Sequence, residues 1–356
     1  INGIGFDYLR ARRQSVLFIA LSLFRLVLVI SLNIYFVIFL RLGVLGILWS
    51  TLIVAVITTL ILTVPILYKV GVKFNKNKIK EMVRFGLPLI PSQLGAFIVH
   101  LSDRFFIKGY CSVADAGLYS LGYRFGTIPG NFISSPFNQV WQPRRLELYK
   151  QPDSEVLFGR IFTYYLALVT FSGLGVAVLT KEVLMIMADE KFWSAYRIVP
   201  IIVLANIVFT LHYHFNMGII IKKKTKYLAY INFSNGMLIL VLNFLLIPSY
   251  GVFGAAYATL IAFIYKVALT YYFSSRFYAI HFEVLRIAKI TGAALLLFVL
   301  CSFLEIRNVY TGFAVKSFIL LWYPAVLWAL GFYSMEEKAK IAIFIPRLFP
   351  ERNGKS

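Results

Sequence analysis

The feature that most constrains this chain is a series of ten apolar stretches, each long enough to cross a lipid bilayer. They cover residues 15–40, 43–68, 86–108, 117–140, 159–180, 196–220, 227–247, 252–273, 286–304 and 313–334. A membrane-spanning helix needs about 20 mostly apolar residues, whereas the strands of a membrane barrel show alternating segments of about ten. The chain is therefore predicted to be an all-α, polytopic membrane helical bundle with about ten transmembrane helices.

The composition supports a membrane protein and excludes several other classes. Only 14% of the 356 residues are charged and 60% are hydrophobic, whereas a soluble domain carries about 25% charged residues. The net charge of +21 does not indicate a nucleic-acid partner, because no polar domain is present on which a basic face could form. Cys111 and Cys301 are too few for a disulfide framework or a metal cluster. Neither a cofactor nor a metal site is expected.

The connections between the stretches differ strongly in basic charge. One set, which alternates with the other along the chain, contains 25 Lys and Arg residues, and the other set contains six. Because basic connections stay in the cytoplasm, this asymmetry predicts a multi-pass protein of the cytoplasmic (inner) membrane with both ends cytoplasmic. Anionic headgroups of membrane lipids are a second expected partner of the basic clusters.

An internal repeat divides the chain. Residues 43–53, GVLGILWSTLI, and residues 251–261, GVFGAAYATLI, are identical at six of eleven positions and open the second and eighth stretches, and Asn33 and Asn243 fall near the ends of the preceding stretches. A parallel repeat of six spans predicts two pseudo-symmetric lobes. We expect residues 1–68 to be the last two helices of an N-terminal lobe that lacks its first four. The expected further parts are a cytoplasmic linker (69–85), a C-terminal six-helix lobe (86–273), two appended helices (286–334) and a cytoplasmic tail (335–356).

Short motifs near the ends of the spans indicate a family. They are Tyr8-Leu9-Arg10-Ala11, Phe85-Gly86-Leu87-Pro88, Ser102-Asp103-Arg104-Phe105, Ala116-Gly117-Leu118-Tyr119-Ser120 and Trp141-Gln142-Pro143. With them the chain resembles the polysaccharide flippases of the Wzx type, in the multidrug/oligosaccharidyl-lipid/polysaccharide exporter superfamily. The resemblance implies two lobes around a central cavity and alternating access. It also implies a polyprenyl-pyrophosphate-linked oligosaccharide as cargo for O-antigen, lipopolysaccharide or capsule assembly, with polysaccharide polymerase machinery as a partner.

Charged residues inside apolar spans are the candidate site residues, because burying each in lipid costs about 2.5–3.5 kcal/mol. The candidates for binding the diphosphate of the cargo are Arg25, Arg104, Arg124 and Lys266. Asp103 is the one acid within the predicted spans. It is a candidate for coupling or gating, and its depth also allows a structural ion pair with Arg124. Lys316 is expected to extend toward the outer interface.

Several uncharged residues in the spans predict helix packing rather than a binding or metal site. Gly122, Gly126 and Gly130 recur at every fourth position and predict a close helix approach. Pro129 and Pro136 predict a bend in the same span. The pair His212 and Asn216 favours hydrogen bonding between helices over a metal site.

Three alternatives to an oligosaccharide flippase stay open. A drug or cation exporter of the same superfamily would need acids in its lobes, and Asp103 alone is available. A peptidoglycan-precursor flippase also stays open, because nothing in the sequence excludes it. A membrane-embedded glycosyltransferase would need a catalytic acid or base at the membrane surface, but the longest outer connection, Lys181–Ala195, shows no recognisable motif. No phosphate-binding loop for ATP is found. The prediction is a transporter, not an enzyme, driven by a gradient.

Overall fold

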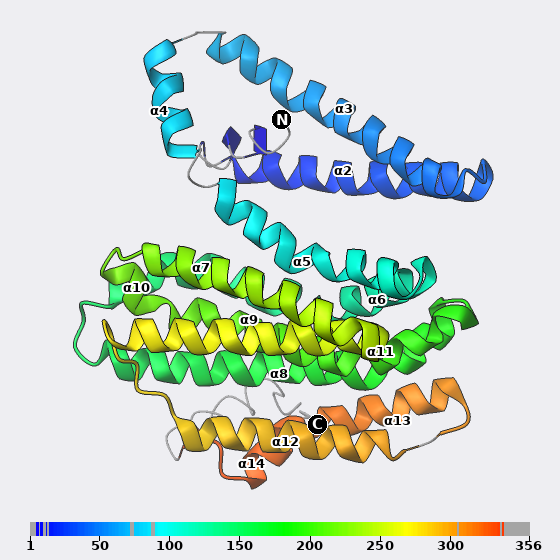
Figure 1. Ribbon diagram of the computed structural model, residues 1–356, viewed down its shortest axis with the longest axis vertical. Coiled ribbons are helices and arrows are strands. Elements are labelled where there is room, and N and C mark those ends of the chain that lie inside the picture. The colour runs from blue at the N-terminus through cyan, green and yellow to red at the C-terminus, as the bar shows by residue number, and fades with distance from the viewer. Residues whose placement is uncertain are drawn as a thin grey trace, which may run out of the picture. The chain divides into compact units, whose positions relative to one another are not determined.

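The computed structural model describes residues 5, 6, 8, 9, 12, 14–71, 75–86, 90–304, 306–334 and 337. Within these residues the secondary structure is helical and contains no strand (Figure 1). Seven helices in the described part of the chain are long and apolar enough to cross a membrane. The prediction of an all-α, polytopic membrane protein is confirmed. The chain divides into two compact units, Ile1–Gly86 and Leu87–Ser356, which are described separately.

The first unit contains a helical hairpin followed by a short helix. Helix α2 (Ser15–Ile34) continues through the π-helical turn η1 (Tyr35–Phe39), and α3 (Gly43–Val70) returns beside it. The chain reverses around Arg41 and Gly43, whose φ values are 51° and 54°, and glycine adopts a positive φ without the steric cost of a Cβ. Helix α4 (Lys76–Gly86) follows α3.

The second unit begins with the residues of the third and fourth predicted spans. Helix α5 (Ile90–Tyr110) leads into α6 (Val113–Gly126), the π-helical turn η3 (Gly130–Ser134) and α7 (Ser135–Leu148). The span predicted over 117–140 is therefore interrupted, and the interruption includes Pro129 and lies next to Pro136, where the sequence predicts a bend. Neither α5 nor the α6–α7 segment is among the seven long apolar helices, because both carry many polar residues.

The helices that follow α7 complete the second unit (Figure 1). They are α8 (Ser154–Met187), the 3-10 helix η4 (Glu190–Arg197), α9 (Val199–Phe215), α10 (Met217–Ile221) and α11 (Lys226–Ser275). Helices α12 (Val284–Ser302), α13 (Val309–Leu321) and α14 (Tyr323–Ala329) follow, and both α12 and α13 pack on α8.

Helix α11 is a hairpin of two spans. The backbone leaves the helical conformation at Gly251, where φ is 55°. The ring of Tyr227 in the first leg lies 4.9 Å from that of Phe273 in the second, so the legs run antiparallel. The predicted separation into spans 227–247 and 252–273 is confirmed.

Close helix packing around α6 depends on two of the three glycines in its stripe. A Cβ on Gly122 would lie 2.8 Å from Ile198 Cδ1, and one on Gly126 would lie 2.4 Å from Ile202 Cγ2. Atoms do not approach that closely, so α9 and the turn before it can pack here only against glycine. Gly130 has open space where its Cβ would be, and its role in packing was predicted wrongly.

Candidate functional site

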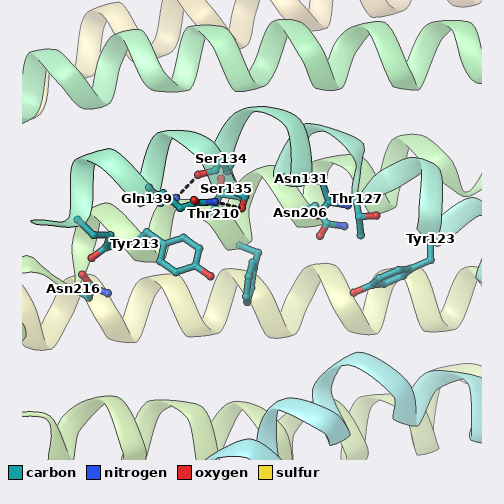
Figure 2. A pocket seen from close by; sticks show the side chains of 14 residues that line it. Tyr123, Thr127, Asn131, Ser134, Ser135, Gln139, Asn206, Thr210, Tyr213 and Asn216 are labelled. Atoms are coloured by element: carbon teal, nitrogen blue, oxygen red, sulfur yellow. Dashed lines mark hydrogen bonds between the residues drawn. The ribbon is translucent and has the colours of Figure 1, made fainter. Parts of the chain in front are cut away.

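A cavity of about 730 Å³ lies in the second unit, between the α6–α7 segment and α9. Figure 2 shows the labelled side chains of both segments around this common space. The lining residues are Tyr123, Thr127, Gly130, Asn131, Ser134, Ser135, Asn138, Gln139, Gln142, Asn206, Phe209, Thr210, Tyr213 and Asn216. All but Gly130 and Phe209 carry an amide or a hydroxyl group, and none of these fourteen is charged.

Interrupted helices form the wall of the cavity. The π-helical turn η3 contributes Gly130, Asn131 and Ser134, and α9 ends at Phe215, just before the lining residue Asn216. Breaks in membrane helices are tolerated where the freed backbone lines a cavity, and π-helical turns are frequent at functional sites. The interrupted backbone and the polar side chains thus both indicate this cavity as the candidate functional site.

Two buried amide oxygens of the lining lack a donor. Asn138 donates from Nδ2 to the Ser134 carbonyl at 2.8 Å, but its Oδ1 accepts no hydrogen bond from the described residues. Asn216 Oδ1 is likewise without a donor. Both side chains are more than nine-tenths buried. Because these oxygens are themselves buried and an unpaired buried acceptor is costly, a ligand with hydroxyl donors would favour a rearrangement that turns them toward the cavity.

Two cations lie just behind the uncharged lining. Arg145 is 2% exposed and donates to the Tyr213 carbonyl and to Gln142 Oε1. Lys266 Nζ lies 4.7 Å from the ring centroid of Phe209. Among the described residues neither cation pairs with an acid. Their charges add a positive potential to the cavity without direct contact with its space.

The structure brings Asp103 and Arg104 together, not Asp103 and Arg124. Arg104 Nη1 lies 2.8 Å from Asp103 Oδ1, and its guanidinium lies over the rings of Tyr119 and Tyr123 at 5.6 and 4.6 Å. These tyrosines occupy the face of α6 toward Asp103. Arg124 follows Tyr123 and therefore points to another face, where it is exposed. The predicted Asp103–Arg124 pair is wrong.

The residues predicted to bind substrate fall in both units. Arg25 is an exposed residue of α2 in the first unit. Arg104, Arg124 and Lys266 belong to the second unit, and none of them is among the residues that line the cavity. Their assignment as substrate-binding residues stays a prediction.

Lys316 is buried, in contrast to the expected extension toward the interface. Its Nζ donates to Glu182 Oε1 at 2.6 Å, and both side chains are less than a tenth exposed. The sequence places Glu182 in an outer connection, but α8 continues to Met187 and carries the carboxylate against α13. The pair links the C-terminal helices to α8.

The amide-rich lining was missed by the sequence reasoning. Charge does not mark this lining in the sequence, because Asn131, Asn138 and Asn206 are uncharged and scattered over two predicted spans. A search for amides in apolar stretches would have found them, because a buried amide is also costly in lipid unless it has a partner.

Together the helices and the interrupted, polar-lined cavity define a polytopic helical membrane protein with a solute-sized site in its second unit. The sequence profile of the polysaccharide biosynthesis protein family matches residues 8–187, and the chain belongs to that family.

Two relatives agree with this class. The probable low-salt glycan biosynthesis flippase Agl15 of Haloferax volcanii is 23% identical over 240 residues, which cover 65% of this chain and 50% of Agl15. The chain thus spans about half the length of this curated relative. The structure of the lipid II flippase MurJ in an inward closed conformation is similar with a TM-score of 0.68 and 14% identity, over 85% of this chain and 65% of MurJ. The resemblance to flippases, a class of transporters and not enzymes, is confirmed.

Proposed function

We propose that this protein moves a polyprenyl-pyrophosphate-linked oligosaccharide across the cytoplasmic membrane by alternating access, as a step in cell-surface polysaccharide assembly. The observation that carries the proposal is the cavity lining, which is rich in amides and hydroxyls, has unpaired acceptors at Asn138 and Asn216, and contains no charged side chain. The amide and hydroxyl oxygens of such a surface can accept hydrogen bonds from sugar hydroxyls. Membership of a polysaccharide biosynthesis family supports this cargo.

The cations have a second role in the proposal. Arg25, Arg104, Arg124 and Lys266 are proposed to attract or bind the diphosphate, because guanidinium groups offer paired donors to phosphate oxygens. Asp103 is proposed to gate the movement by exchanging partners between conformations. Both ends of the chain are proposed to be cytoplasmic, as the basic connections predict.

A peptidoglycan-precursor flippase is the second candidate function. The fold similarity to the lipid II flippase MurJ favours it, and a lipid II headgroup also carries hydroxyl donors. A drug or cation exporter is less well supported, because no acid is among the lining residues.

Binding of labelled lipid-linked oligosaccharide to the purified 356-residue chain tests the proposal. Asn138→Leu and Asn216→Leu should each weaken binding about tenfold, the effect of about one lost hydrogen bond. Asn235→Leu is the matched control, because Asn235 is also buried with an unpaired Oδ1 but is not a lining residue. Wild-type affinity in both cavity variants would contradict the proposal. Stronger competition by lipid II than by the oligosaccharide would favour the second candidate.

A further inference from the structure

Helix α4 has a composition unlike that of any span. Its sequence, KNKIKEMVRFG, contains four cations and one acid in eleven residues. Asn75 caps its start by accepting hydrogen bonds at Oδ1 from the backbone N–H groups of Asn77 and Lys78, at 3.0 and 3.1 Å. An α-helix of this length extends about 16 Å, roughly half of what is needed to span a bilayer.

The cations and the apolar residues of α4 lie on adjacent faces. Lys76 and Lys80 lie one turn apart and therefore on one face of the helix, and Arg84 follows in the sequence at the same spacing. Ile79, Met82 and Val83 form the neighbouring apolar face. All three apolar side chains are exposed, Met82 by 72%.

The connection to α3 fixes where α4 must lie. α3 is long and apolar enough to cross a membrane, and it ends at Val70, five residues before the cap of α4. Five residues of extended chain reach at most about 18 Å. The start of α4 is therefore held near the bilayer surface where α3 emerges.

A row of like charges at four-residue spacing destabilises an isolated helix by a few tenths of a kcal/mol per pair, and an anionic partner relieves that cost. Lipid headgroups are within reach, carry negative charge, and adjoin acyl chains that can cover an apolar face. We propose that α4 is a surface helix that recognises the anionic headgroups of the membrane in which the spans are embedded, with its apolar face inserted below them. This role is independent of the cargo.

A fluorescent probe on α4 tests the proposal. The full chain carries Met82→Cys, with Cys111→Ser and Cys301→Ala to leave a single thiol, and is reconstituted in phosphatidylcholine or in phosphatidylcholine mixed with phosphatidylglycerol. Quenching of the probe by acrylamide in the water phase should be several-fold weaker in the anionic bilayer, and added salt should reverse this protection.

Charge variants separate recognition by α4 from an effect of net charge. Each surface cation strengthens attachment to an anionic membrane about fivefold, so Lys76→Gln, Lys80→Gln and Arg84→Gln combined should abolish the lipid dependence. Lys222→Gln, Lys223→Gln and Lys224→Gln combined remove the same charge from another connection and should leave it intact. Equal quenching of the probe in both bilayers would overturn the proposal. So would an equal loss of the lipid dependence in the two triple variants.

Discussion

The internal repeat places a similar local sequence in two hairpins that have different surroundings. In the first unit the chain reverses between α2 and α3 at Gly43, and in the second unit it reverses within α11 at Gly251, with φ of 54° and 55°. Three residues later, Gly46 lies against Phe36 and Gly254 against the backbone of Leu246. Thr51 and Thr259 each donate to the carbonyl four residues before. The matched glycines therefore stand at both reversals, but the first also has a positive φ at Arg41 (51°), and its Gly46 meets a residue ten positions earlier, whereas Gly254 meets one eight positions earlier.

The polar partners of the hairpins differ. In the first hairpin, Ser50 donates to Asn33 Oδ1, so the pair is internal. In the second, the equivalent Asn243 is fully buried and donates to Ser102 Oγ of α5 at 3.2 Å. The repeat thus specifies the turn, while the helices packed around it decide which polar groups meet.

The largest expected effect on stability concerns Gly46 and Gly254, the glycines packed closely against the preceding helix. A Cβ on Gly254 would lie 2.3 Å from the Leu246 carbonyl oxygen, so Gly254→Ala must move backbone and should cost about 2 kcal/mol of unfolding free energy. At Gly46 the nearest atom is Phe36 Cβ at 3.0 Å, and Gly46→Ala should cost less than half as much. Thermal unfolding of the purified variants measures both. Equal losses would show that the two turns are packed alike.

A smaller effect is expected from the turn glycines themselves. Gly43→Ala meets no atom within 4 Å, and Gly251→Ala meets only Cys111 Sγ at 3.7 Å. Gly43→Ala should therefore lose only the cost of a positive φ, about 1 kcal/mol. Gly251 also has a ψ of −132°, a combination open essentially to glycine alone, so Gly251→Ala should cost about 1.5 kcal/mol. The same unfolding measurement applies. A difference of more than about 1 kcal/mol between the variants would mean that surroundings, and not the turn, set the cost.

The smallest effect comes from the asparagines, because a hydrogen bond between membrane helices is worth about 0.6 kcal/mol on average. A double-mutant cycle of Asn243→Leu with Ser102→Ala should show a coupling of that size. The cycle of Asn33→Leu with Ser50→Ala should show a similar coupling inside its own hairpin. As a control, Asn243→Leu and Ser50→Ala should be additive. Absence of coupling between Asn243 and Ser102 would remove the difference on which the comparison depends.

Much of the fold could be predicted because its signals are local. The length and hydropathy of the stretches fixed the helices, and the repeated glycines indicated both reversals. The interruption of the 117–140 span followed from Pro129 and Pro136, although the π-helical turn did not, because a proline shows where a helix is disturbed and not how its backbone is repaired.

The sequence by itself determined that this is a helical membrane protein, where its chain reverses and which family it resembles. These properties can be read from the sequence because they depend on local features, namely the length of the apolar stretches, the positions of the glycines and the basic charge of each connection. Only the tertiary structure decided that Asp103 pairs with Arg104, that Lys316 meets Glu182, and that scattered amides such as Asn138 line one cavity. The physical reason is that a polar side chain in a membrane takes its partner from whichever helix packs beside it. That choice depends on where each helix ends and which face it turns inward.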